Sequence, residues 1–240
     1  MHNAHHRAAD LDIDVLVVGA GPSGLTVSAA LARTGIRALT IDRHPGTSTF
    51  PKATGVRLRT MEILRSWGLD DQLPQRDNDV RLVMLVSPTL VAPAPRLQEV
   101  PLGVPDDGRT STVSPSRFAF CAQDQLEPVL LSHVRERGGE VRFGTELTSL
   151  TTDERGATAR LRSLPGGPSY VVRARYVVGA DGGTSGVRRS AGIGWSVLGS
   201  EGHHLSVLFR GDLSAAVGQL SYALYATVAP GAEAMFVATG

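Results

Sequence analysis

The stretch "IDVLVVGAGPSG", residues 13–24, decides the fold of this chain. Its first seven residues form a short apolar run that ends in glycine, which is typical of a buried parallel strand. The segment "GPSGLTVSAALARTG" (21–35) predicts a helix that ends near its last glycine. "IRALTIDR" (36–43) then predicts a second strand. Together these elements predict the βαβ start of an α/β domain.

The glycines of "GAGPSG" (19–24) follow the pattern G-x-G-x-x-G between a strand and a helix. In this pattern Gly19 allows the tight turn, Gly21 lets the backbone approach a pyrophosphate, and Gly24 lets helix and strand pack closely. The free N–H groups and the positive end of the helix dipole hold the phosphates. Asp42 lies 18 residues after Gly24, where a carboxylate accepts the ribose hydroxyls. The motif therefore predicts a dinucleotide site.

The residues at the end of the second predicted strand narrow the choice of dinucleotide. Asp42 is followed by Arg43, and no basic residue replaces the carboxylate. This argues against a 2′-phosphate at this position and leaves NAD or FAD.

Two more helices are predicted further along the chain. "TGVRLRTMEILRSWG" (54–68) predicts a helix, and the helical period places four of its residues on one face: Thr60, Ile63, Leu64 and Trp67. "DQLEPVLLSHVRERG" (124–138) predicts a helix capped by Asp124, with Glu127 three residues later. Its expected buried face is Leu126, Val129, Leu130 and Val134.

The remaining predicted elements are strands. One is "VRLVMLV" (80–86), and four more lie between residues 140 and 181, where "PGGP" (165–168) turns the last two into a hairpin. After residue 195 only short candidates remain: "HHLSVLFRG" (203–211), "YALYATV" (222–228) and "AMFVAT" (234–239). The chain is α/β first and β-rich last.

Composition excludes several classes of function. With 240 residues, 42% hydrophobic and 20% charged, the chain is of ordinary globular composition. A net charge of +1 gives no large electrostatic field that would attract nucleic acid or acidic membranes. A single cysteine suits a reducing cytoplasm, and no apolar run reaches the ~18 residues of a membrane span. No residues show metal-ligand spacing, so we expect no metal site.

Five segments in sequence order resemble one known family. They are "GAGPSG", "IDR", "PKATGVRLRTMEILRSWGL", "FAFCAQDQLEPVLLSHV" and "ARYVVGADGGTSGVRR". In these segments the chain resembles the single-component aromatic-ring flavoprotein monooxygenases, the family of para-hydroxybenzoate hydroxylase, and within it the polyketide and phenol hydroxylase branch. The resemblance covers about residues 13 to 195.

The resemblance implies a cofactor, a reaction and a set of site residues. The fold is a Rossmann-like FAD-binding domain with a partial β-rich substrate region, FAD is the cofactor and NAD(P)H the co-substrate. The reaction hydroxylates an aromatic or polyketide substrate with O₂ through a C4a-hydroperoxyflavin, and the resemblance identifies no catalytic residue. The implied cofactor-binding residues are Gly19, Gly21, Ser23, Gly24, Asp42, Arg43, Arg59, Gln123, Asp181 and Gly182.

The Asp-Gly motif of the family falls on Asp181 and Gly182, where the aspartate serves the pyrophosphate side and the segment also serves NAD(P)H. An aspartate cannot attract phosphate by its charge, so it must orient water, backbone or ribose. Ser185 and Arg188 would finish this turn and start a helix. Gln123 matches a glutamine near the ribityl chain or phosphates, and Arg59 matches an arginine of an R-T-x-E segment.

The family's second cofactor motif, Gly-Asp followed by small residues and a histidine, has no match in this chain. "RGDLSAA" (210–216) lacks the histidine and is interpreted as a turn. We therefore expect a tail over 1–11, an FAD-binding domain over 12–194 and an incomplete β-rich region over 195–240. The chain alone is expected to be inactive, with an open edge covered by a partner chain or a homo-oligomer.

Two other functions remain open from the residues. One is a non-catalytic flavin-binding or interaction module, which the missing second motif favours. The other is a NAD-dependent oxidoreductase that uses only the first glycine motif, which the Asp-Gly motif and Gln123 disfavour. In each case the expected location is the cytoplasm.

Overall fold

The computed structural model describes residues 11–74, 81–91, 98–101, 113–197, 199, 202, 204–217 and 222–237. The chain divides into two compact units, each built from two segments. The first unit is Met1–Thr49 with Leu126–His203, and the second is Phe50–Gln125 with His204–Gly240. The division into 12–194 and 195–240 stays a prediction. β1 begins at Leu11, so this residue is not part of a tail, and residues 1–10 lie outside the described residues.

The first unit is built on a six-stranded sheet in the order β5-β2-β1-β8-β7-β6. Its strands are β1 (Leu11–Val18), β2 (Ala38–Ile41), β5 (Glu140–Arg142), β6 (Thr145–Asp153), β7 (Gly156–Ser163) and β8 (Ser169–Gly179). β5, β2, β1 and β8 are parallel, whereas β7 and β6 add an antiparallel hairpin edge. The predicted hairpin between the last two of these strands is confirmed as β7 and β8.

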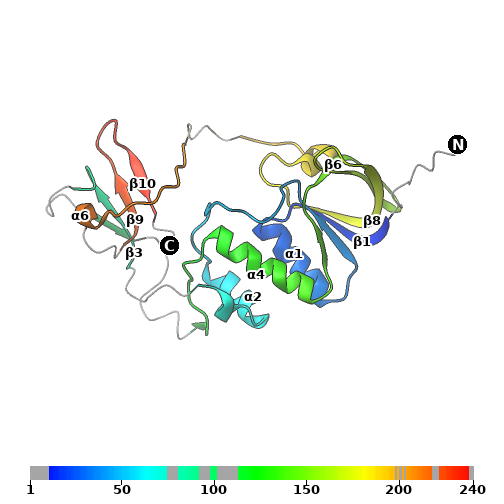
Figure 1. Ribbon diagram of the computed structural model, residues 1–240, viewed down its shortest axis with the longest axis horizontal. Coiled ribbons are helices and arrows are strands. Elements are labelled where there is room, and N and C mark those ends of the chain that lie inside the picture. The colour runs from blue at the N-terminus through cyan, green and yellow to red at the C-terminus, as the bar shows by residue number, and fades with distance from the viewer. Residues whose placement is uncertain are drawn as a thin grey trace. The chain divides into compact units, whose positions relative to one another are not determined.

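The predicted βαβ start is confirmed. α1 (Pro22–Arg33) connects β1 to its parallel neighbour β2, and α4 (Gln123–Glu136) lies beside α1 (Figure 1). β1 is apolar because it lies in the middle of the sheet, where Leu16 and Val17 are fully buried. The core continues through Leu39 of β2 and Val172 of β8. The sequence pattern therefore fixes the centre of this sheet.

The strand order brings the two glycine-rich segments together. β8 is the parallel neighbour of β1, and in their register Val18 is opposite Gly179. The chain leaving β8 also donates the N–H of Ala180 to the carbonyl of Val18 at 2.7 Å. Because the carboxyl ends of parallel strands meet at one edge of a sheet, "GAGPSG" and "GADGG" lie side by side.

The second unit contains a four-stranded sheet in the order β10-β9-β3-β4. Its elements are α2 (Leu58–Ser66), the 3₁₀ helix η1 (Asp70–Gln72), β3 (Arg81–Ser87), β4 (Gln98–Pro101), α6 (Ser214–Val217), β9 (Tyr222–Thr227) and β10 (Ala234–Phe236). The strand predicted over 80–86 is confirmed as β3. It pairs with β9, which lies more than 130 residues later in the chain.

The predicted strand over 203–211 is wrong in its described part. Residues 204–211 form no strand, and Leu205 is 91% exposed. A strand needs a neighbour for its backbone N–H and C=O groups, and these residues pair with no strand in the described ranges. The segment "RGDLSAA" ends in a turn and a short helix, as Asp212 accepts the N–H of Ser214 at 2.9 Å just before α6.

The predicted faces of two helices need correction. In α2 the buried residues are Met61 and Leu64, while Thr60 is exposed, because spacing alone does not distinguish adjacent faces of a nine-residue helix. α4 begins at Gln123, so Asp124 lies inside its first turn and does not cap it. Instead Gln125 accepts the N–H of Ala122 at 3.1 Å.

The inward face of α4 is also more polar than predicted. Val129 is only half-buried, whereas Leu126, Leu130 and Val134 are buried as expected. Glu127 and His133 are buried with them. Burial lowers the pKa of the His133 imidazole, and the charges of Arg137 and Arg33 add to this effect.

Candidate functional site

Gly19 is a glycine for two independent reasons. Its φ of +106° lies in a region that side chains rarely adopt, and a Cβ there would lie 2.2 Å from the carbonyl oxygen of Ala180. Gly19 also donates its N–H to Ile41 of β2 at 2.8 Å. The turn after β1 is therefore fixed on both sides, by the neighbouring strand β2 and by the chain leaving β8.

Gly24 is required by packing alone. A Cβ at this position would lie 1.8 Å from the carbonyl oxygen of Gly19 and 3.3 Å from the Cβ of Ala180. The first turn of α1 thus lies directly on the backbone of the preceding turn. This contact matches the role predicted for the third glycine of the motif.

Gly21 differs from both. It is the N-cap of α1, with φ −73° and ψ −174°, a conformation open to any residue. The nearest atom to a Cβ placed there is Oε1 of Glu127, at 3.9 Å. The protein itself does not need a glycine at this position, so the open space beside it fits an incoming ligand.

The N-terminus of α1 supplies the chemistry of that space. Pro22 is the first helical residue and has no N–H, while the N–H groups of Ser23 and Gly24 follow in the first turn. The first turn carries no acidic side chain, and the side chain of Ser23 is exposed. Free N–H groups at the positive end of a twelve-residue helix favour an anion such as a diphosphate.

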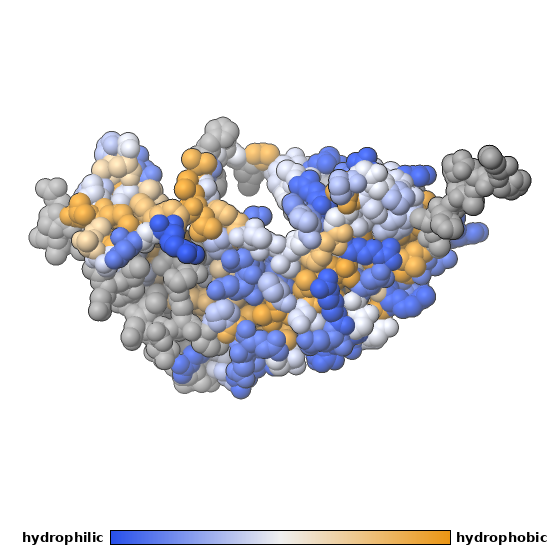
Figure 2. Space-filling view, in the orientation of Figure 1, coloured by the Kyte–Doolittle hydropathy of each residue, from blue (hydrophilic) through white to orange (hydrophobic). Residues whose placement is uncertain are grey.

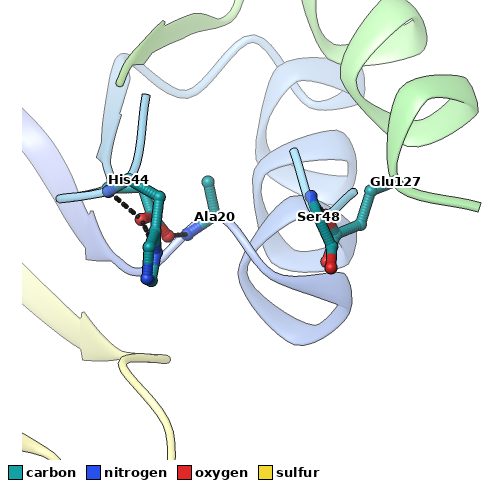
Figure 3. A network of polar contacts seen from close by, with 5 residues as sticks. Ala20, His44, Ser48 and Glu127 are labelled. Carbon is teal, nitrogen blue, oxygen red and sulfur yellow. Dashed lines mark hydrogen bonds and ion pairs between the residues drawn. The ribbon is translucent and has the colours of Figure 1, made fainter. Parts of the chain in front are cut away.

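Asp42 lies at the carboxyl end of β2, next to this loop. Its Oδ2 accepts the backbone N–H of Ala20 at 2.7 Å, and its Oδ1 contacts the backbone nitrogen and Nδ1 of His44, both at 2.8 Å (Figure 3). The carboxylate is 14% exposed. It therefore ties the glycine loop to the residues that follow β2, and it remains accessible to a ligand hydroxyl.

Glu127 also lies in this region, although its place in the sequence indicated only a part in a helix cap. It is 2% exposed, and its Oε2 accepts the backbone N–H of Ser48 at 2.5 Å (Figure 3). The sequence feature that could have indicated its burial is a glutamate between Leu126 and Leu130 on the apolar face of a predicted helix. A buried carboxylate needs hydrogen-bond donors, so such a position indicates a specific partner.

Asp181 organises its own loop. Its Oδ2 accepts the N–H groups of Gly186 at 2.6 Å and Val187 at 3.2 Å, and its Oδ1 accepts the hydroxyl of Ser185. Ser185 in turn caps α5 (Gly186–Ser190) by accepting the N–H of Arg188 at 2.9 Å. The carboxylate orients backbone, one of the roles that its charge allows, and Ser185 and Arg188 start the helix as predicted.

Gly182 follows with φ +82°, and no atom of the described residues beyond its chain neighbours lies within 4 Å of a Cβ placed there. The left-handed conformation explains the glycine, and the open space leaves room beside the loop. Whether Asp181 and Gly182 contact the cofactor stays a prediction.

The surroundings of three further predicted site residues, Arg43, Arg59 and Gln123, are as follows. Arg43 is exposed, directly after Asp42. Arg59 belongs to the second unit, where it is 80% exposed and pairs with Glu62 at 2.8 Å. Gln123 begins α4, and its backbone N–H donates to Ala53 at 2.7 Å. Their roles at the cofactor stay predictions.

The second unit does connect two of the family-like segments to each other. Val56 and Ala119 form an antiparallel bridge, and a Cβ on Gly55 would lie 2.4 Å from the ring of Phe118. Together with the hydrogen bond from the N–H of Gln123 to the carbonyl of Ala53, these contacts place "PKATGV" along "FAFCAQ".

The cysteine of "FAFCAQ", Cys121, is buried. Burial raises the pKa of its thiol to about 11, with a smaller contribution from the charge of Asp124. A raised pKa and burial both disfavour the thiolate, the reactive form of a cysteine.

Two absences concern the described part of the chain only. No helix in it has the length and apolar character to cross a membrane. Within the same residues, no three His, Cys, Asp or Glu side chains are grouped so that they could hold a metal ion.

Comparisons with known proteins agree with this geometry. Residues 12–240 match the family described as "FAD binding domain". The aklavinone 12-hydroxylase DnrF of Streptomyces peucetius subsp. caesius is 40% identical over 214 residues, which cover 86% of this chain and 43% of the relative. This chain thus spans less than half the length of that curated relative.

Solved structures give the same result. The flavin-dependent monooxygenase PieE, in complex with FAD and substrate, matches with a TM-score of 0.79 and 30% identity, over 97% of this chain and 42% of that one. A ternary complex of aklavinone-11 hydroxylase with FAD and aklavinone matches with a TM-score of 0.78 and 36% identity, over 95% and 43%. FAD, not NAD, is therefore the dinucleotide of this fold, and the chain belongs to the FAD binding domain family of the flavoprotein aromatic and polyketide hydroxylases.

Proposed function

We propose that this chain is the FAD-binding part of an NAD(P)H-dependent monooxygenase that hydroxylates an aromatic polyketide or a related phenolic compound. The observation that carries the proposal is the open side of Gly21, at the N-terminus of α1 and beside Asp42. Two glycines of the motif serve the fold, and the third serves only a ligand. The hydroxylases described above supply the reaction class.

The chain's own residues would divide the work on FAD as follows. The N–H groups of Ser23 and Gly24 bind the diphosphate through the open side of Gly21. Asp42 accepts a ribose hydroxyl while it holds Ala20 and His44 in place. When bound, FAD would supply hydride acceptance from NAD(P)H and reduction of O₂, so that one oxygen atom enters the substrate as a hydroxyl group and the other leaves as water.

Of the other predicted site residues, three have proposed roles that rest on the family alone, and the role of Asp181 is also supported by its hydrogen bonds. Arg43, Arg59 and Gln123 would contact the cofactor outside the diphosphate. Asp181 would act indirectly, by holding the loop of Gly182 beside the turn at Gly19. We also propose a cytoplasmic location, where NAD(P)H is supplied.

A chimera tests the proposed reaction. Residues 12–240 would replace the matching part of aklavinone 12-hydroxylase DnrF, and the chimera would be assayed with NADH or NADPH and a panel of phenolic and polycyclic aromatic compounds. We expect bound FAD and a hydroxylated product whose formation depends on NAD(P)H. A chimera that folds and binds FAD, yet forms no hydroxylated product with any compound of the panel, would contradict the reaction while leaving the cofactor site intact.

The surface supports a partner that covers apolar side chains. In the first unit Ile193, Trp195 and Val197 are each at least 60% exposed, and the second unit exposes residues 205–209. Figure 2 shows apolar surface over β9 and α6 of the second unit. We propose that another polypeptide surface, from a partner chain or a second copy, covers these residues. Light scattering of the purified chain is expected to show self-association. A strictly monomeric chain would rule out a second copy, so that the covering surface would have to come from another polypeptide.

The non-catalytic module remains the second candidate function. The apolar side chains exposed on both units favour such a module. The rate of FAD reduction by NAD(P)H distinguishes it from a monooxygenase. A module binds FAD but does not accelerate its reduction by NAD(P)H in the chimera described above.

A further inference from the structure

The segment between β2 and the second unit is held at two points by carboxylates. We call residues 42–48 the β2 loop. At its start Asp42 binds Ala20 of the glycine turn and the N–H of His44. At its end Ser48 donates its backbone N–H to Glu127 at 2.5 Å. The loop therefore connects the glycine turn to α4.

Glu127 is fixed in its position more firmly than a surface carboxylate would be. It is 2% exposed, and it lies on α4 between the buried residues Leu126 and Leu130. Burying a carboxylate is unfavourable unless donors compensate it, and a charge-assisted bond to a backbone N–H is among the stronger hydrogen bonds. The side chain is thus a rigid acceptor that α4 presents to the β2 loop.

The second carboxylate oxygen of Glu127 faces the glycine loop. Oε1 lies 3.9 Å from the position of a Cβ on Gly21, and among the described residues, chain neighbours aside, no other atom lies within 4 Å of that position. Figure 3 shows the Glu127 side chain next to Ser48, beside the helix that follows Ala20. One carboxylate therefore borders the open side of Gly21 and holds the end of the β2 loop.

We propose that Glu127 is a positioning residue for FAD: by holding Ser48, it keeps the β2 loop beside the open side of Gly21, with Asp42 turned toward Ala20. This role rests on the proposed cofactor site at Gly21, Ser23 and Gly24. Glu127 acts through the loop and not by contact with the phosphates, because two negative groups repel each other.

This role depends on the acceptor oxygen and not on the charge. Glu127→Gln keeps an oxygen for Ser48 and removes the negative charge beside the diphosphate. Glu127→Leu keeps the approximate size of the side chain and removes the acceptor. The two variants therefore separate the two properties, and Glu136→Gln is a matched control, because Glu136 is an exposed glutamate of the same helix.

The test measures the affinity for FAD by flavin fluorescence in the parent chain and the three variants, with amide hydrogen exchange at Ser48 in the apo chain. We expect Glu127→Leu to raise the Kd for FAD about tenfold or more, the effect of losing one charged hydrogen bond. Glu127→Gln is expected to stay within about threefold of the parent or to bind more tightly. Glu136→Gln should equal the parent.

Hydrogen exchange gives a readout that does not depend on FAD. The Ser48 amide should be protected in the parent and in Glu127→Gln, and exchange freely in Glu127→Leu. If Glu127→Leu does not fold, hydrogen exchange of the parent chain is the test. A Ser48 amide that exchanges freely in the parent would overturn the proposal.

Two results at the cofactor would also overturn it. FAD binding by Glu127→Leu at the parent's affinity would remove the role of Glu127 and leave the cofactor site standing. Equally weak binding by both Glu127 variants would show that the charge, and not the acceptor, matters. A parent chain that binds no FAD would instead overturn the cofactor site itself, together with this role.

Discussion

Two glycine-rich loops lie next to each other at the carboxyl ends of β1 and β8, and they use the same residue types differently. In the loop at 19–24 the carboxylate comes from outside, from Asp42 at the end of β2. In the loop at 179–186 the carboxylate of Asp181 accepts N–H groups of its own segment. The first turn of α1 therefore has no acidic side chain and no side-chain cap, as the proposed FAD site requires, whereas Asp181 and Ser185 accept the first N–H groups of α5.

The second loop also shapes the first. The carbonyl of Ala180 lies where a side chain on Gly19 would be, and the Cβ of Ala180 borders Gly24. The loop after β8 thus acts as a support for the turn after β1. The sequence of a glycine motif does not reveal which glycines are required for packing and which leave space for a ligand. Here the contacts with Ala180 identify Gly19 and Gly24 as the packing glycines.

The largest effect is expected at a packing glycine. Gly24→Ala would place its Cβ 1.8 Å from the backbone of Gly19, which neither segment can relieve without moving. We expect a loss of about 3 kcal/mol or more in the free energy of unfolding, measured by chemical denaturation of the apo chain. Gly194→Ala is the control, since within the described part of the chain no atom beyond its neighbours lies within 4 Å of a Cβ there. Equal stability of both variants would contradict the packing role.

The next effect separates binding from folding. Gly21→Val has an ordinary backbone conformation and open space for its Cβ, so the apo chain should lose only about 1 kcal/mol, the effect of replacing an N-cap glycine by valine. The valine side chain would enter the space proposed for the diphosphate, and we expect the Kd for FAD to rise by about a hundredfold, or ~3 kcal/mol. A variant that is destabilised as strongly as Gly24→Ala, or that binds FAD normally, would break the distinction between the two glycines.

Asp42→Ala should have a smaller effect on FAD. It removes an acceptor for the ribose and the bonds to Ala20 and His44, so we expect FAD binding to weaken by about 1–3 kcal/mol. Titration of the variant with FAD measures this loss. Asp153→Ala, at an exposed turn where Asp153 accepts the N–H of Arg155, is the matched control and should bind like the parent. An Asp42→Ala affinity equal to that of the control would mean that the site is misassigned.

The smallest effect on FAD is expected from the supporting loop. Asp181→Ala removes the acceptor for the first N–H groups of α5, and losing such a cap reduces stability by about 0.5–2 kcal/mol. Thermal melting of the apo chain should detect this change, while the Kd for FAD should change less than in Asp42→Ala. A stronger loss of FAD binding than in Asp42→Ala would show that the second loop contacts the cofactor directly.

The sequence predicted the first unit well because local patterns determined it. The apolar run at 13–19 and the glycine spacing define one strand and one turn, and both depend on residues close in the chain. The roles of Gly19 and Gly24 were predictable for the same reason. Asp42 at the end of β2 followed from its distance along the chain.

Long-range pairing set the limit of prediction. β3 pairs with β9 across more than 130 residues, which no local pattern reveals. The polar contact between Ser48 and Glu127 joins residues 79 apart, so Glu127 was interpreted only as part of a cap. The apolar segment at 204–211 had the composition of a strand, but a strand also requires a neighbour.

The most direct test of the cofactor site follows the backbone amides of the labelled apo chain by NMR during titration with FAD, with NAD in a parallel arm. The central claim is that FAD binds at the open side of Gly21. It predicts that the largest shifts with FAD fall on Gly21, Ser23 and Gly24, with little change at Gly194 and weaker changes with NAD. Saturable FAD binding that leaves the amides of 21–24 unmoved, or tight NAD binding without uptake of FAD, would contradict it.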